Sequence, residues 1–276
     1  MFKTILLPTD FSDISRSAIE YALKLFEKQS CTFYLLNSTS LAVSSMSNFS
    51  SRLTTTLINT AKSELNQMAE NLMKGRINPN HNFKTLVNQD HLDDSVEWAV
   101  NKFGIDLIVM CTKGATGAKS VFFGSNTVHV IKSIKNCPVL IVPEDFKYSE
   151  IKEIAFPTDF ERFYSEKEIL PLKKMAGLFD AQIRILHINE EEELNSVQEY
   201  NKSVLTKILE SRNIRFHWMP DYAKKAMEIH VFIETLYIDM LAMVRYKHSI
   251  LEAIFNEPVI KKISFKAKVP FLVMPE

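Results

Sequence analysis

The sequence predicts an α/β protein of two tandem doubly wound domains, each a five-stranded, mostly parallel sheet with helices on both faces. Short apolar runs of strand length alternate with longer segments whose apolar residues have helical spacing. The series occurs twice in the 276 residues, and each copy begins near the same tetrapeptide, Pro-Thr-Asp-Phe, at residues 8–11 and 157–160. Strands that alternate with helices at these lengths form parallel sheets covered on both faces.

The first copy contains five apolar segments that we interpret as strands. They cover residues 2–7, 32–36, 83–87, 106–110 and 137–142. Pro8 ends the first strand, because proline has no N–H to donate to a ladder.

Four segments with helical spacing separate these strands. Ser12 or Asp13 can cap the first helix. The second is a long helix that follows a serine-rich stretch at residues 38–51, and the third spans residues 92–103. The fourth begins at Gly124-Ser125, where we expect Ser125 to be the N-cap.

The second copy repeats this order. Residues 151–156, 183–188, 239–243 and 269–276 match the first, second, fourth and fifth strands of the first copy. An ordered series of matches over the whole length indicates a tandem duplication. We predict domains at residues 1–146 and 147–276, with the junction near residues 145–150.

Composition excludes several classes of function. The formal net charge is zero, so there is no basic field for nonspecific nucleic-acid binding. No apolar run approaches 18 residues and no signal peptide precedes the first strand, so we expect neither a membrane span nor secretion. Cys31, Cys111 and Cys137 lie in apolar runs, and we predict reduced cysteines in or near the core of a cytoplasmic protein.

The segment at residues 106–144 has the order strand, loop, helix, strand, and it is the best candidate for a site. Three of the six glycines of the chain, Gly114, Gly117 and Gly124, fall in its loop. A flexible loop that leads into a helix N-terminus favours anion binding, because unpaired N–H groups and the helix dipole converge there. The alternative, that these glycines serve only as turn residues, stays open.

The order Gly114-x2-Gly117, then Gly124-Ser125, then the run CPVLIV at residues 137–142 resembles the nucleotide loop of the universal stress protein family. Six residues separate Gly117 from Gly124, three fewer than ATP-binding members usually have. The resemblance covers nearly the whole chain as two such domains, and it implies an adenine nucleotide alpha hydrolase-like fold. It also implies a stress-response regulator or sensor that binds ATP, AMP or another adenine nucleotide. Whether Mg²⁺ accompanies the nucleotide is left open.

Asp10 follows the carboxyl end of the first strand, which is where ligands bind in open α/β sheets. A carboxylate suits ribose hydroxyls or adenine better than phosphate, since like charges repel. A purely structural aspartate in a turn is an equal alternative. The resemblance implies ligand contacts from two sets of residues. On the adenosine side they are Pro8, Asp10 and Ser38, and on the phosphate side Lys113, Gly114, Thr116, Gly117, Gly124, Ser125 and Asn126.

The second copy has lost the glycine loop. Lys247 and Ile250 stand where Gly114 and Gly117 are, and Asn256-Glu257 replaces Gly124-Ser125. A β-branched residue resists positive φ, and a glutamate at the helix start repels phosphate. We therefore expect this domain to be structural, and we interpret His187 as a core or rim histidine with satisfied hydrogen bonds rather than as a ligand.

Enzyme signatures are scarce, since the chain has no Walker loop, nucleophile elbow or metal-protease helix. We favour binding over catalysis, with weak ATP hydrolysis at most. The alternative is a nucleotide-free, dimerising scaffold or interaction protein of the same family. In the family, domains pair through the last strand, so the resemblance implies an internal pair here and leaves a further homodimer open.

Overall fold

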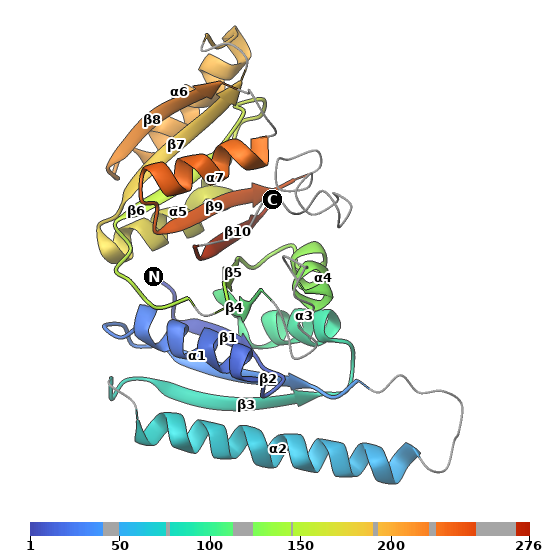
Figure 1. The fold of residues 1–276 in the computed structure, drawn as a ribbon. Helices are drawn as coiled ribbons and strands as arrows, with labels where there is room; N and C mark the ends of the chain where they lie inside the picture. The colour runs from blue at the N-terminus through green and yellow to red at the C-terminus, as the bar shows by residue number, and fades with distance from the viewer. Residues whose placement is uncertain are drawn as a thin grey trace. The chain divides into compact units, whose positions relative to one another are not determined.

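The structure is a computed structural model that describes residues 1–40, 50–75, 78–112, 124–144, 146–189, 193–220, 225–246 and 269–276. The chain is an α/β protein in which strands and helices alternate twice (Figure 1). It divides into two compact units whose boundary in the sequence lies between Val139 and Leu140. The predicted boundary after residue 146 lies a few residues further on and stays a prediction.

The first repeat contains every strand and helix that the sequence predicts, with ends that differ by a few residues. Its strand order is β3-β2-β1-β4-β5, and β1 pairs in parallel with both β2 and β4. The elements are β1 (Thr4–Pro8), α1 (Asp13–Leu25), β2 (Thr32–Ser38), α2 (Ser50–Lys74), β3 (Asn82–Asn88), α3 (Leu92–Phe103), β4 (Leu107–Cys111), α4 (Ser125–Ser133) and β5 (Val139–Val142).

The second repeat has the same strand order, read in the sheet as β8-β7-β6-β9-β10. Its pairs β6–β7, β6–β9, β7–β8 and β9–β10 are all parallel. The elements are β6 (Glu153–Pro157), α5 (Glu166–Phe179), β7 (Gln182–Asn189), α6 (Ser196–Leu209), β8 (Ile214–Pro220), α7 (Lys225–Thr235), β9 (Met240–Arg245) and β10 (Phe271–Pro275). The predicted counterpart of α4 falls outside the described residues.

An aspartate at the start of a central strand occupies the same position in both repeats. Oδ2 of Asp106, just before β4, accepts two backbone N–H groups at the start of β1, at 2.9 and 3.1 Å. Oδ2 of Asp239, just before β9, accepts the equivalent pair at the start of β6, at 2.8 and 2.9 Å. The duplication is therefore preserved at the level of individual hydrogen bonds.

The central strands are buried on both faces, as parallel sheets require. β4 and β5 consist entirely of buried residues, and β1 is buried except at its first residue. The three cysteines are buried free thiols, as predicted. Among the helices of the described ranges, none is both long and apolar enough to cross a membrane.

Corresponding helices of the two repeats, α3 and α7, are followed by a residue in the same left-handed conformation, but the residue type differs. Gly104 ends α3 in the left-handed conformation at φ 62°, two residues before Asp106. After α7, Tyr237 stands at the same distance from Asp239 and has φ 51°. This conformation costs a residue with a Cβ roughly 1–2 kcal/mol, whereas glycine adopts it freely.

We predict that Tyr237→Gly raises the free energy of unfolding by about 0.5–1 kcal/mol, because it relieves this strain while adding some chain entropy to the unfolded state. The side chain is 85% exposed, so little packing is lost. Urea unfolding followed by circular dichroism measures the change. Tyr237→Ala is the control that keeps the Cβ, and an equal gain in that variant would contradict the explanation.

Candidate functional site

A cleft of about 420 Å³ opens at the carboxyl ends of β1, β2 and β4 in the first repeat. Of the residues predicted to contact a ligand, it brings together Pro8, Asp10, Ser38 and Asn126. Gly124 and Ser125 precede Asn126 at the start of α4. The other predicted residues, Lys113, Gly114, Thr116 and Gly117, lie outside the residues that the structure describes.

The turn after β1 is held by side-chain oxygens. The Thr9 hydroxyl accepts the Phe11 N–H at 3.0 Å and lies 2.9 Å from the Ser15 hydroxyl. Oδ1 of Asp10 accepts the N–H and the hydroxyl of Ser12, at 3.1 and 2.6 Å. Phe11 has φ 64°, which is unusual for a residue with a side chain. Asp10 therefore has a structural role in the turn and also lines the cleft, and its contact with a ligand stays a prediction.

The end of β2 forms a second wall of the cleft. The Asn37 amide donates to the Thr9 carbonyl at 2.8 Å, which ties β2 to the turn after β1. The Ser38 hydroxyl donates to the Asp90 carbonyl at 2.6 Å, so this side chain already has a structural partner. Asn37 was not predicted as a site residue, although its place near the carboxyl end of an inner strand was a usable signal.

The start of α4 differs from the prediction. The Gly124 N–H donates to the Thr112 carbonyl at 2.6 Å, and the Gly124 carbonyl accepts the Val128 N–H at 3.1 Å. Gly124 is therefore the N-cap, with φ −59° and ψ 153°, and Ser125 is the first helical residue. The prediction of Ser125 as N-cap was wrong because the bond to Thr112 fixes the extended conformation one residue earlier.

This helix start is suited to an anion. Among the described residues no side chain caps α4, and the first turn of this helix contains no acidic residue. The buried Thr127 hydroxyl donates to the Cys111 carbonyl at 3.0 Å and is 3.4 Å from the Thr112 carbonyl, which fixes the helix at the end of β4. The first N–H groups of α4 thus lie beside the cleft with the positive end of the helix dipole. Sequence analysis concentrated on glycines and missed Thr127.

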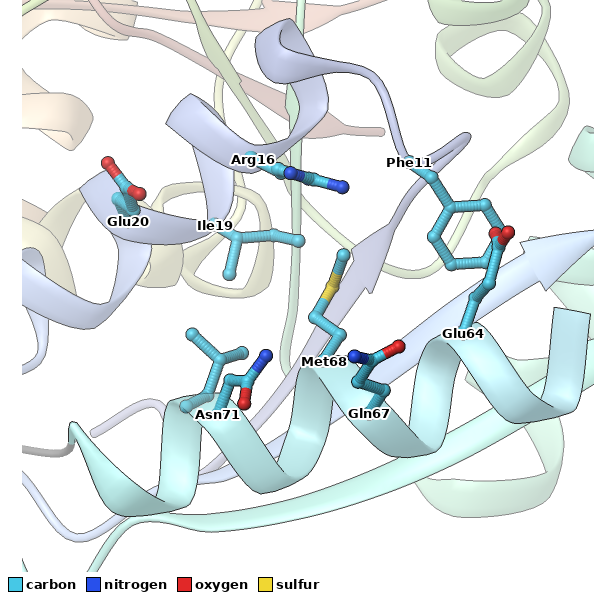
Figure 2. Close-up of a pocket in the computed structure, with 9 residues that line it drawn as sticks. Phe11, Arg16, Ile19, Glu20, Glu64, Gln67, Met68 and Asn71 are labelled. Carbon is cyan, nitrogen blue, oxygen red and sulfur yellow. The ribbon is translucent and has the colours of Figure 1, made fainter.

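A second cavity of about 490 Å³ lies between α1 and α2 and includes the Phe11 side chain (Figure 2). In the second repeat, α6 takes the place of α2 and is hydrogen-bonded to the corresponding turn. The Gln198 amide donates to the Asp159 carbonyl at 3.0 Å, and the Asn201 amide donates to the Phe160 carbonyl at 2.7 Å. The ring of Phe160 is buried there, whereas Phe11 is half-buried.

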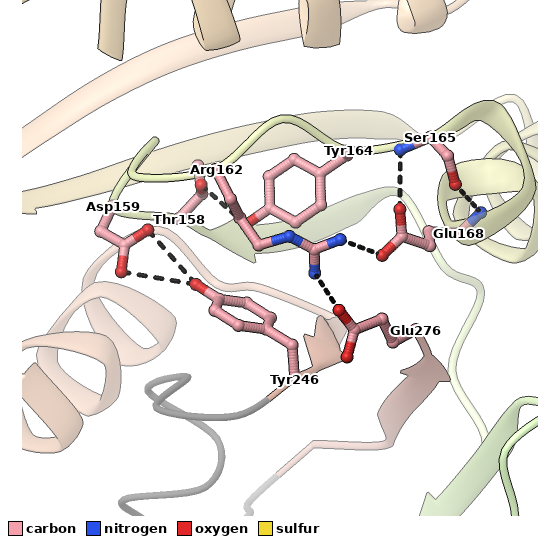
Figure 3. Close-up of polar contacts among 8 residues, drawn as sticks. All are labelled: Thr158, Asp159, Arg162, Tyr164, Ser165, Glu168, Tyr246 and Glu276. Atoms are coloured by element: carbon pink, nitrogen blue, oxygen red, sulfur yellow. Dashed lines mark hydrogen bonds and ion pairs between the residues drawn. The ribbon is translucent and has the colours of Figure 1, made fainter. Parts of the chain in front are cut away.

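The second repeat keeps the turn, and two tyrosine side chains are hydrogen-bonded to it (Figure 3). The Thr158 hydroxyl accepts the Phe160 N–H at 3.1 Å and lies 2.9 Å from the Tyr164 hydroxyl, where the first repeat has Ser15. The Tyr246 hydroxyl donates to both oxygens of Asp159, at 3.3 and 3.4 Å. Burial raises the pKa of Tyr164 to about 12 and also raises the pKa of Tyr246, so both hydroxyls remain protonated.

Arg162 packs against both tyrosine rings. Its guanidinium lies 5.3 Å from the centre of the Tyr164 ring and 4.6 Å from that of Tyr246. The guanidinium forms an ion pair with Glu168, and its Nη1 lies 3.9 Å from Oε1 of Glu276. Aromatic and charged side chains of the protein thus lie beside Asp159 in the second repeat.

His187 is the counterpart of Asn37 and is buried, as predicted. Its Nδ1 lies 3.2 Å from the Thr158 carbonyl, to which it donates in the corresponding tautomer. Among the described residues, its Nε2 has no hydrogen-bond partner, so the expectation of a histidine with satisfied hydrogen bonds is met only at Nδ1. Burial lowers the pKa of this histidine, so the neutral ring predominates near neutral pH.

Glu168 anchors α5 and provides a pH-dependent test. Burial favours its neutral form, but the Ser165 N–H and hydroxyl and the Arg162 guanidinium outweigh burial and lower the pKa. A lowered folded-state pKa adds stability above the ordinary carboxyl pKa, and this contribution is lost as pH falls through the folded-state value.

We predict that Glu168→Gln lowers the free energy of unfolding by roughly 1–3 kcal/mol at pH 7, because it weakens hydrogen bonds to a charged acceptor. The difference from wild type should shrink as the pH falls below the ordinary carboxyl range. Glu166→Gln, on the exposed side of the same first turn, is the matched control. Urea unfolding at several pH values measures both variants, and a pH-independent deficit in Glu168→Gln would contradict the assignment.

Comparison with known proteins identifies the class that this fold and cleft define. The profile of the Universal stress protein family matches residues 1–143, just over half of the chain. The chain therefore belongs to the universal stress protein family. It is 28% identical to Universal stress protein MJ0577 of Methanocaldococcus jannaschii over 159 residues, which cover 51% of this chain and 95% of the relative.

Solved structures extend the similarity of fold to both repeats. A universal stress protein from Archaeoglobus fulgidus superposes with a TM-score of 0.68 and 16% identity, over 99% of this chain and 96% of its own. A putative universal stress protein from Pseudomonas aeruginosa gives a TM-score of 0.63 and 12% identity, over 99% of this chain and 93% of its own. At these identities the comparison concerns the fold alone.

Proposed function

We propose that the first repeat binds an adenine nucleotide and that the protein acts as a nucleotide-dependent sensor or regulator in a stress response. The observation that carries the proposal is that Asp10 and the uncapped start of α4 meet at one cleft. The volume of about 420 Å³ lies in the range of small-ligand sites. In this proposal the ligand site belongs to a domain at residues 1–146, and residues 147–276 form its structural partner.

Asp10 is assigned to the ribose or adenine end, and α4 to a phosphate. The second repeat supports the first assignment, because Asp159 in the equivalent turn accepts an O–H group from Tyr246. A ribose hydroxyl would be an equivalent donor for Asp10. The second assignment is supported by the start of α4, which has no acidic residue in its first turn and no side-chain cap from the part of the chain that the structure describes.

A nucleotide-free scaffold is the competing function, and one observation favours it. Asp10 already accepts two hydrogen bonds within its own turn, so a ligand is not needed to explain it. Internal pairing of the domains, further dimerisation and a cytoplasmic location remain predictions under both functions. Catalysis is not part of the proposal.

Isothermal titration with ATP, ADP and AMP tests the proposal. We expect one saturable site per chain in the wild type and no detectable binding in Gly117→Val. Asp10→Ala should weaken binding roughly tenfold to a hundredfold, because a hydrogen bond to a charged group contributes roughly 1.5–3 kcal/mol.

The matched control is Asp159→Ala. It removes the equivalent carboxylate of the second repeat, which is bonded to Tyr246, and should leave nucleotide affinity unchanged. Circular dichroism confirms that each variant is folded. A folded wild-type protein that binds none of the three nucleotides would leave the scaffold as the better description.

A further inference from the structure

The cavity between α1 and α2 is a second site in the first repeat (Figure 2). Its volume of about 490 Å³ is in the range of small-ligand sites. Four apolar side chains line it, and they are different residues from those that line the cleft at Asp10. Ile19 is buried, whereas Phe11, Met68 and Leu72 are half-buried and keep apolar surface open to the cavity.

Opposite charges stand on the two helices that enclose this cavity. The guanidinium of Arg16 belongs to α1, and the carboxylate of Glu64 belongs to α2. Both residues are exposed, and the ion pairs found among the described residues do not join them to each other. Figure 2 shows Arg16 and Ile19 extending from α1 toward Met68 on α2. A ligand with one negative and one positive group can therefore pair with both helices while its apolar part contacts Met68.

The two ends of the cavity differ. Phe11 and Glu64 lie at one end, and Glu20 and Asn71 lie at the other (Figure 2). An aromatic ring and a carboxylate together attract an ammonium group, because the face of the ring carries negative partial charge. Glu20 and Asn71 are exposed, and we assign neither of them to the ligand.

The corresponding helices of the second repeat, α5 and α6, are held by direct contacts. Gln198 and Asn201 of α6 donate hydrogen bonds to carbonyls of the turn after β6. Arg212, just after α6, lies so close to Gly177 of α5 that a Cβ at this position would collide with the guanidinium. The fold therefore permits direct contact between these helices, and the cavity of the first repeat reflects the particular side chains that line it.

We propose that this cavity binds a free amino acid with an apolar side chain. The carboxylate of the ligand pairs with Arg16, whose planar guanidinium matches a carboxylate in shape and charge. The ammonium group pairs with Glu64 at the Phe11 end of the cavity. The apolar side chain covers Met68 and Leu72 and removes their remaining surface from water. The site does not depend on nucleotide binding, so it is a function beyond the one proposed above.

Isothermal titration with leucine and with phenylalanine tests the site, and analogues that lack one charged group are the matched probes. Isocaproate and hydrocinnamate lack the ammonium group, whereas isoamylamine and phenethylamine lack the carboxylate. We expect one saturable site per chain for at least one of the two amino acids. Both analogues of that amino acid should bind roughly threefold or more weakly, because each loses one ion pair at an exposed rim.

Charge variants assign the two ends of the ligand. Arg16→Gln should weaken binding of the amino acid roughly threefold without weakening the amine analogue, and Glu64→Gln should do so without weakening the acid analogue. Glu70→Gln makes the same charge change as Glu64→Gln on an exposed position of α2 outside the cavity lining, and it should leave the affinity unchanged. Arg52→Gln, also exposed on α2, is the corresponding control for Arg16→Gln. Circular dichroism confirms that each variant is folded.

Three results would overturn the proposal. The first is a folded wild-type protein that binds neither amino acid saturably. The second is an analogue that binds as tightly as its amino acid, because one of the two charges would then be unnecessary. The third is an equal loss in a cavity variant and its control, because the effect would then reflect net charge rather than the cavity. The titrations contain no nucleotide, so their failure leaves the proposed nucleotide site in place, and the reverse also holds.

Discussion

The threonine in the turn after the first strand of each repeat is the constraint on which the site depends. Its hydroxyl accepts the N–H of a phenylalanine two residues later, and its own N–H donates to the carbonyl of the neighbouring strand, at 2.8 Å in the first repeat and 2.9 Å in the second. These bonds hold Phe11 at φ 64° and Phe160 at φ 55°, a conformation that would otherwise be costly. The strained turn directs the preceding aspartate toward the carboxyl end of the sheet, where a parallel sheet offers its ligand site.

Because the turn is the same in both repeats, the difference between them comes from the residues that surround it. Ser15 in the first repeat is replaced by Tyr164, and Asn37 by His187, each of which keeps the hydrogen bond to the threonine with a bulkier side chain. Both exchanges preserve the backbone and place a bulkier side chain beside the turn. The bonds that hold the turn thus tolerate a change in the size of the side chains around it.

Much of this arrangement followed from local patterns in the sequence. Strand and helix positions were predictable because burial of parallel strands and amphipathic helices leaves a strong periodic signal. The duplication was predictable from the repeated tetrapeptide and strand order. Asp10 could be placed at the site because it directly follows a strand end.

Other features depend on residues that are distant in the sequence. The N-cap of α4 is Gly124 rather than the predicted Ser125, because the Gly124 N–H is bonded to the Thr112 carbonyl. The role of Thr127 depends on the carbonyls at the end of β4. In the second repeat, Arg162 contacts the ring of Tyr246, although 84 positions separate the two residues in the sequence. No local pattern specifies such a contact.

The distribution of acidic residues connects the two levels. Acidic residues at the starts of α1 and α3 stabilise those helices through their dipoles, which is a sufficient structural reason for each taken alone. Their combined effect is to leave α4 as the described helix start at the cleft with an uncompensated positive end. Acidic residues that are ordinary in the first turn of a helix therefore also set the electrostatic character of the site. They do so because several helices of this fold begin at the edge of the sheet where the ligand is expected.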